Sequence, residues 1–194
     1  MAHTIATPVG QAVYPKLVTP DTKFNPDGLY SCKLIVSEED YNAFRAQVQP
    51  LVDQEYKKYC VAQGKDNIKR ATEPVRISED GQYEINTKQV ARTTTKQGDV
   101  LEFKVALFDA DVKPITNEPN IGSGSKMKLS VQPYFWHVPS QGFGYTLRLK
   151  AAQILELVEF TSGGHGFSKE SGFTQGESFE EVIIEDEVTE TPNF

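Results

Sequence analysis

The chain has 194 residues, and its 27 Asp and Glu outnumber its 20 Lys and Arg, which gives a formal net charge of −7. A chain of this length suits one domain with appendages or two small domains, and it can bury a core without disulfide staples. The sequence has no long uncharged apolar run, and no basic segment followed by an apolar one near residue 1. We therefore expect no transmembrane helix, no secretory signal and no membrane partner.

The charges are divided along the sequence. Residues 177–194 contain seven acids and no Lys or Arg, so the rest of the chain carries 20 acids and 20 bases. From Ser162 the chain is rich in Gly and Ser before it becomes acidic, and such a composition builds little core. We predict one domain over residues 1–161, followed by a flexible linker and a disordered acidic tail over residues 162–194.

In chain order, the first predicted strand covers residues 5–18 and is interrupted by two prolines and a glycine, which is typical of a kinked or edge strand. A turn follows over residues 20–28, and residues 28–36 alternate between apolar and polar as a strand does.

A helix is predicted next, over about residues 37–63. Ser37 with Asp40 resembles a capping box, and apolar residues then recur every three or four positions. Pro50 should kink this helix or divide it in two, and Gly64 is placed to cap its C-terminal end.

Beyond the helix the pattern is mainly that of strands. Residues 65–82 are polar and irregular and indicate an excursion or a short hairpin. Strands are predicted over residues 83–95, 100–108, 126–136 and 143–151, with a turn at 96–99 and a long loop over 109–125. We assign Phe103, Leu107, Phe143 and Tyr145 to the core. The chain is therefore expected to be mainly β, an OB-fold-like barrel of five to six strands with one substantial helix; a β-sandwich is the alternative.

The stretch from Lys126 to Lys150 carries the main functional signal. Its first half alternates: Met127, Leu129, Val131 and Phe135 share one parity, whereas Lys126, Lys128, Tyr134 and Trp136 share the other. Positive charge for phosphates together with flat rings for bases is what single-stranded nucleic acid requires. An ordinary half-exposed strand, with the two rings packed under a loop, is the alternative, and a bulge at Pro133 would break the parity.

Other basic and aromatic residues extend this predicted surface. The further candidates for phosphate contact are Lys88, Arg92, Lys96, Lys33 and Arg148, and the further candidates for stacking are Phe24 and Tyr30. Tyr30 shares its parity with Leu34 and fits the core equally well.

Catalytic and metal-binding patterns are weak. Cys32 and Cys60 form no CxxC pair, so we expect two reduced thiols in an intracellular protein, with no zinc site. Asp109 and Asp111 could bind a divalent cation, although acids two apart in a loop are more often turn formers. We expect no cofactor, no metal and no enzymatic activity. The competing enzyme hypothesis is a metal-dependent nuclease built on these two aspartates.

Several motifs, taken in order, resemble the single-stranded DNA-binding proteins of T7-like bacteriophages. They are Asn25-Pro26-Asp27-Gly28-Leu29-Tyr30, Gly122–Gly124, Ser125-Lys126-Met127-Lys128, Pro133-Tyr134-Phe135-Trp136, Leu157-Val158-Glu159, Gly163-Gly164 and the last residue, Phe194. The chain departs from the family pattern at Asp27, where the family has a basic residue, and its tail is shorter and carries more aliphatic residues.

The resemblance implies an OB-fold protein that coats single strands in phage DNA replication, recombination and repair, in the cytoplasm of the infected bacterial host. It also implies a possible homodimer, and a tail that contacts the phage DNA polymerase and helicase/primase. We expect the tail to compete with DNA and to recruit these proteins through Glu185, Asp186, Glu187, Glu190 and Phe194. The alternative is a β-barrel module for protein–protein interaction or virion assembly that binds no nucleic acid.

Overall fold

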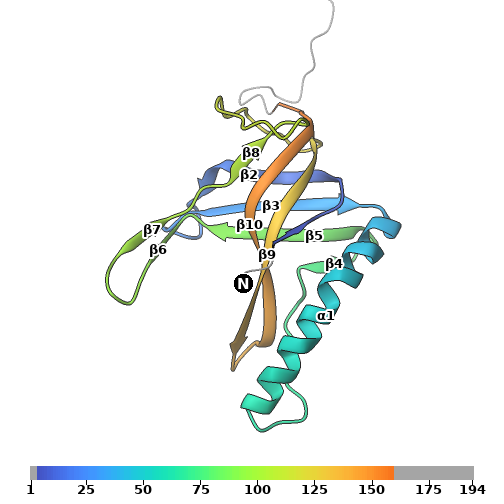
Figure 1. The fold of residues 1–194 in the computed structure, drawn as a ribbon, viewed down its shortest axis with the longest axis vertical. Helices are drawn as coiled ribbons and strands as arrows, with labels where there is room; N and C mark the ends of the chain where they lie inside the picture. The colour runs from blue at the N-terminus through green and yellow to red at the C-terminus, as the bar shows by residue number, and fades with distance from the viewer. Residues whose placement is uncertain (1–3, 160–194) are drawn as a thin grey trace, which may run out of the picture. The chain divides into compact units, whose positions relative to one another are not determined.

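The computed structural model describes residues 4–159, so the predictions for the linker and the acidic tail lie outside the described residues. The strands are β1 (Ile5–Ala6), β2 (Gly10–Asp21), β3 (Leu29–Val36), β4 (Val75–Ile77), β5 (Tyr83–Val90), β6 (Arg92–Thr94), β7 (Val100–Glu102), β8 (Ala106–Phe108), β9 (Lys126–Val138) and β10 (Gly142–Glu156), and the helix is α1 (Glu38–Ala62). Figure 1 shows their arrangement, with the long β9–β10 ribbon crossing β2, β3 and β5.

Five strands close into a ring. β2 pairs with β3, β3 with β5, β5 with β10 and β10 with β9, and β9 returns to pair with β2. The β5–β10 pair is parallel, with Leu147 opposite Thr87, whereas the other pairs in the ring are antiparallel. A five-stranded barrel with one parallel closure is the OB-fold arrangement, so the predicted fold class is confirmed.

The alternation read from the sequence builds the barrel interior. Leu34 and Ile85 face each other across the β3–β5 pair, and both are fully buried. Met127 and Leu129 of β9 and Leu147 of β10 are equally buried. Each such side chain contributes about 1.5–3 kcal/mol relative to an exposed one, so register along these strands is strongly fixed.

The helix begins and ends as predicted. The Ser37 hydroxyl accepts a hydrogen bond from the backbone N–H of Asp40 at 3.1 Å, which satisfies a donor of the first turn. At the other end the Gly64 and Lys65 amides donate back into the last turn, with Gly64 at a φ of 61°. The expected division at Pro50 is wrong, because a single helix continues through that residue.

The helix braces the tip of the β9–β10 ribbon. The Tyr56 and Tyr59 rings lie 5.4 and 5.3 Å from the Phe143 ring, between centroids. The segment after the helix also contacts the tip of the ribbon, because the Phe143 amide donates to the Lys69 carbonyl at 2.8 Å. A Cβ at Gly142 would lie 2.0 Å from that same carbonyl oxygen, so only glycine fits there.

Two predicted strands are interrupted in the structure. Residues 83–95 divide into β5 and β6, and residues 100–108 divide into β7 and β8. β6 and β7 form a separate two-stranded sheet, the hairpin that projects from the barrel in Figure 1. Leu107, Phe143 and Tyr145 are buried as predicted, but Phe103 is only partly buried because it lies at the break between β7 and β8. The predicted excursion over 65–82 contains β4, which pairs with β5.

Pro133 does not disturb β9, since its neighbours keep continuous register with β10. Two irregularities lie on β10 instead, between Ile154 and Glu156 and between Leu149 and Ala151, where Lys150 is the extra residue. Such a bulge twists a strand and re-aims its side chains. Here it leaves Lys150 and Ala151 both partly exposed on β10.

Candidate nucleic-acid interface

Two adjoining hollows form a groove across β5, β9 and β10. The first, which we call the Tyr134 hollow, has a volume of about 420 Å³ and is lined by Asn25, Leu29, Lys88, Gln89, Val90, Thr93, Phe103, Tyr134, Trp136, Thr146, Arg148 and Lys150. The second, the Arg76 hollow, has about 280 Å³ and is lined by Thr72, Glu73, Pro74, Arg76, Asn86, Thr87, Lys88, Trp136, Tyr145 and Thr146. Lys88, Trp136 and Thr146 belong to both, so the two hollows adjoin along these residues.

Trp136 is held in place at the junction of the two hollows. Its partner on β10 is Gly144, where an added Cβ would lie 2.5 Å from an indole carbon. The indole therefore lies over the bare glycine backbone. Its Nε1–H donates to the Thr146 hydroxyl at 3.2 Å, which fixes the ring in its plane.

Tyr134 carries a cation on its ring. It is 46% exposed, and the guanidinium carbon of Arg148 lies 3.6 Å from the ring centroid. A guanidinium this close to an aromatic face gains a cation–π attraction. The pair therefore presents a flat surface and a positive charge at one point of the groove.

Among the residues that the structure describes, three cations and no acid line the Tyr134 hollow. Arg148 of β10 is the register partner of Lys88 on β5, and Lys150 follows Arg148 at the bulge. Burial lowers the pKa of Lys150, and the nearby Arg148 charge lowers it further. Lys88, Arg148 and Lys150 make no ion pair with any carboxylate in residues 4–159. The hollow therefore concentrates uncompensated positive charge beside aromatic rings.

Several predicted phosphate contacts are paired with carboxylates outside this hollow. Arg92 lies 3.1 Å from Glu102 on the β6–β7 hairpin. Lys126 lies 2.9 Å from Glu156 at the far end of β9. Lys33 is paired with a carboxylate of β5 and lines neither hollow.

Other predicted residues are exposed but line neither hollow. Lys128 shares the far end of β9 with Lys126, and Lys96 lies in the turn of the β6–β7 hairpin. Phe24, in the β2–β3 loop, is 87% exposed, and its neighbour Asn25 lines the Tyr134 hollow. Tyr30 is 5% exposed and packs in the core, which corrects its assignment as a stacking residue.

The structure brings five predicted residues together with others that the sequence reading missed. The predicted ones in or beside the groove are Tyr134, Trp136, Lys88, Arg148 and Phe24. Phe103 was assigned to the core, but it lines the groove with the Lys150 amine 5.9 Å from its ring centroid. Lys150 could have been predicted from the sequence, since it alternates with the apolar residues of β10. No sequence pattern points to Arg76.

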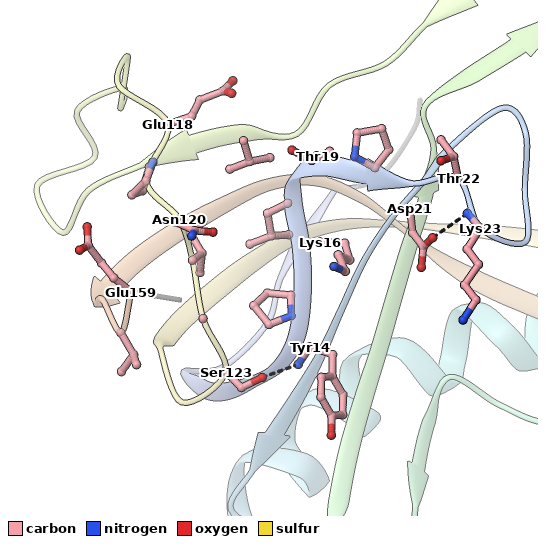
Figure 2. A pocket seen from close by; sticks show the side chains of 18 residues that line it. Tyr14, Lys16, Thr19, Asp21, Thr22, Lys23, Glu118, Asn120, Ser123 and Glu159 are labelled. Carbon is pink, nitrogen blue, oxygen red and sulfur yellow. Dashed lines mark hydrogen bonds between the residues drawn. The ribbon is translucent and has the colours of Figure 1, made fainter. Parts of the chain in front are cut away.

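A third hollow, of about 880 Å³, lies between β2 and the loop that precedes β9 (Figure 2). Two lysines line it together with three carboxylates, those of Asp21, Glu118 and Glu159. Tyr14, 80% exposed, is its only aromatic residue, and the Tyr14 amide donates to Ser123 at 2.9 Å. This charge balance does not favour a polyanion.

The remaining candidates for chemistry have structural roles. One Asp109 carboxylate oxygen accepts hydrogen bonds from the Asp111 and Lys113 amides, as a turn-forming aspartate does. Among residues 4–159, no three His, Cys, Asp or Glu side chains are grouped as metal ligands would be. Cys32 and Cys60 are buried free thiols, and burial raises the pKa of Cys32 to about 12. No helix within the same range is long and apolar enough to cross a membrane.

An OB-fold-like barrel with a cationic, aromatic groove over its strands is characteristic of proteins that bind single-stranded nucleic acids. The comparisons agree with this class. The family model for the single-stranded DNA-binding protein of bacteriophage T7 matches residues 9–157, and the chain belongs to that family.

Solved structures from two phages share this fold. The chain is similar to gp2.5, a single-stranded DNA-binding protein encoded by bacteriophage T7, with 18% identity and a TM-score of 0.72 over 91% of this chain and 100% of that one. It is also similar to the single-stranded DNA-binding protein from bacteriophage Enc34 in complex with ssDNA, with 12% identity and a TM-score of 0.58 over 80% and 88%. A search of curated protein sequences gave no match.

Proposed function

We propose that this chain binds single-stranded DNA in the groove without sequence preference, and that it acts in phage DNA replication and recombination. The observation that carries the proposal is the Tyr134 hollow, where three cations and three aromatic rings meet with no lining acid. Tyr134 and Trp136 stack on bases, while Lys88, Arg148 and Lys150 contact phosphates. Phe103 and Phe24 are further rings along the path. Base stacking and phosphate contact are both tolerant of sequence.

Trp136 is the only tryptophan of the chain, so its fluorescence reports on the groove directly. We expect an oligo(dT) strand to quench its emission at low salt, and the affinity to fall as salt is raised, because bound phosphates release counterions. A duplex of the same length should compete poorly. If neither emission nor anisotropy changes at low salt, the groove does not bind DNA, and the protein-interaction alternative takes its place.

The acidic tail is proposed as a competitor for the groove. Seven acids in residues 177–194 complement the unpaired cations of the Tyr134 hollow. Removing residues 177–194 should tighten ssDNA binding at low salt and change it less at high salt, because screening weakens both interactions. Equal affinity of the two chains at low salt would contradict this competition.

The same tail is proposed to recruit the phage DNA polymerase and helicase/primase once DNA has displaced it, with Glu185, Asp186, Glu187 and Glu190 as charged contacts. Phe194 would be the apolar anchor, a residue type suited to the centre of an interface. Removing Phe194 alone should weaken capture of these proteins while leaving DNA affinity unchanged. A homodimer, and a place in the cytoplasm of the infected host, complete the proposal. Sedimentation of the full chain with and without DNA tests the dimer.

A further inference from the structure

The groove does not end at Trp136, since the Arg76 hollow continues it to the short strand β4. Trp136 and Lys88 line both hollows, whereas Arg76 lines the Arg76 hollow alone. Glu73 is the only carboxylate among the lining residues, and it lies 3.8 Å from the Arg70 guanidinium, which offsets its charge. A strand leaving the Trp136 ring would thus meet a second cation.

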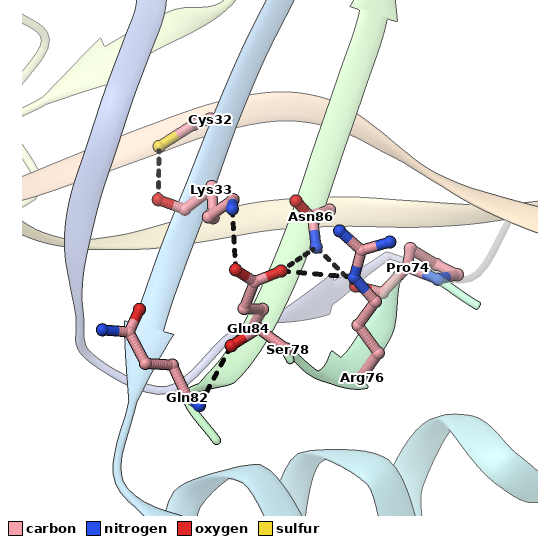
Figure 3. Close-up of polar contacts among 8 residues, drawn as sticks. All are labelled: Cys32, Lys33, Pro74, Arg76, Ser78, Gln82, Glu84 and Asn86. Carbon is pink, nitrogen blue, oxygen red and sulfur yellow. Dashed lines mark hydrogen bonds and ion pairs between the residues drawn. The ribbon is translucent and has the colours of Figure 1, made fainter. Parts of the chain in front are cut away.

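Arg76 is oriented by a buried carboxylate. Its Nε donates to Glu84 Oε2 at 3.2 Å, and the Glu84 side chain is only 4% exposed (Figure 3). The Asn86 amide donates to the same oxygen at 3.3 Å, and the Lys33 amine lies 2.7 Å from the other oxygen. Glu84 is thereby satisfied on both oxygens and fixed in position, and it holds Arg76 by one nitrogen only.

The rest of the Arg76 guanidinium is available to a ligand. The side chain is 45% exposed, and in residues 4–159 its two terminal nitrogens make no hydrogen bond or ion pair. A guanidinium has donors on both of its edges, so one edge can bind a carboxylate while the other binds a phosphate. Arginine held in this way loses less conformational freedom on binding than a free side chain does.

We propose that the Arg76 hollow is a further nucleotide subsite, in which Arg76, oriented by Glu84, contacts the phosphate of the nucleotide next to the one stacked on Trp136. The inference rests on the proposed function, because it extends the same DNA path by one nucleotide. It assigns a role to β4, a segment whose sequence gave no functional signal.

Lys33 provides a matched control. It shares the Glu84 carboxylate with Arg76 and carries the same charge, but it lines neither hollow. Removing either side chain takes one cation from Glu84 and changes the net charge equally, and the Asn86 amide still donates to Oε2 when Arg76 is absent. A general electrostatic effect would therefore act on both variants alike, whereas a subsite concerns Arg76 alone.

The experiment measures oligo(dT) affinity against salt concentration for the full chain, R76A and K33A, by Trp136 fluorescence. Loss of one phosphate contact lowers the slope of log affinity against log salt by about 0.7 for single strands. We expect this change for R76A and not for K33A. The wild-type advantage over R76A should therefore shrink about fivefold over a tenfold rise in salt. Thermal unfolding of each variant shows that it is folded.

R76K is the second test. Lysine keeps the charge, but its compact ammonium lacks the two planar edges of a guanidinium and is held less rigidly between Glu84 and a phosphate. R76K should therefore recover only part of the slope that R76A loses. A series of oligonucleotides of increasing length should also reach full affinity about one nucleotide earlier for R76A, since it has one subsite fewer.

The outcomes separate this inference from the proposed function. R76A with the slope of the wild type, or K33A with the same loss as R76A, overturns the subsite while DNA binding by the groove stands. Full recovery of the slope in R76K overturns the orientation by Glu84. A wild-type chain that does not bind oligo(dT) at all overturns the proposed function itself.

Discussion

The indole of Trp136 lies over Gly144, its register partner, so closely that a Cβ at residue 144 would stand 2.5 and 2.6 Å from two ring carbons. Glycine is thus the residue that lets the indole lie flat beside Thr146. The stacking platform is made by two strands together, one giving the ring and the other giving the space beneath it.

Changing Gly144 to alanine should displace the Trp136 indole from its position over residue 144. We expect a shift of the Trp136 emission in the free protein and a loss of ssDNA affinity close to that of removing one stacking ring, about 1–3 kcal/mol. T146V is the matched control, because it removes the indole hydrogen bond and keeps the side-chain volume. It should cost less affinity than G144A. Unchanged emission in G144A would mean that the indole does not rest on residue 144.

Tyr134 should contribute to binding through its ring. Y134A is expected to lose about 1–3 kcal/mol of ssDNA affinity, while Y134F should lose little, because the ring and its contact with Arg148 remain. Y14A is the control, since Tyr14 is an exposed tyrosine of the third hollow and its removal should leave affinity unchanged. Equal losses in Y134A and Y14A would contradict the placement of the DNA path. Fluorescence titration with oligo(dT) measures all three.

The salt dependence should distinguish unpaired from paired cations. R148Q is expected to lower the slope of log affinity against log salt by about 0.7, because Arg148 has no carboxylate partner in the described residues. R92Q should change it less, since Arg92 is paired with Glu102 on the hairpin. If R92Q has the larger effect, the path runs over the β6–β7 hairpin instead of the groove.

Glu84 should make the stability of the fold depend on pH. Burial raises its pKa, but hydrogen bonds from Lys33, Asn86 and Arg76 outweigh burial and bring the pKa below the ordinary value. A lowered carboxyl pKa stabilises the fold above the unfolded-state pKa of about 4.3, and this contribution is lost as pH falls through the folded-state value. E84Q should therefore lose about 1–3 kcal/mol at pH 7. The loss should be smaller at pH 3, which lies below the unfolded-state pKa.

Urea unfolding at the two pH values tests this prediction. E156Q is the control, because Glu156 pairs with Lys126 in solvent and its removal should change stability by less than about 1 kcal/mol at pH 7. An equal loss in E84Q at both pH values would show that its effect comes from packing and not from its charge.

The barrel was predictable because alternation fixes which residues face the core. Leu34, Met127 and Leu147 follow a period of two, and the structure buries them accordingly. The helix ends were predictable from local chemistry at Ser37 and Gly64. Pro50 does not divide the helix, because packing of the helix against the barrel outweighs one missing hydrogen bond.

The candidate site was predictable only in part, because a groove depends on contacts between distant strands. Tyr134 and Trp136 share a parity with Lys126 and Lys128 on β9. The strand is long, however, and only its Tyr134 and Trp136 part lines the groove. Whether a cation is free or paired is also a tertiary property. Arg148 and Arg92 look alike in sequence, and only the fold supplies Glu102 to one of them.

β9 both closes the barrel, by pairing with β2 and β10, and displays Tyr134 and Trp136. A shift of one residue against β10 would turn both rings toward the core and bring Phe135 out in their place. Closure of the barrel and display of the two rings therefore depend on the same pairings of β9 in this chain. The ability to bind a DNA strand should therefore be lost at the temperature where the barrel melts. A titration of DNA-binding sites would then count the folded molecules.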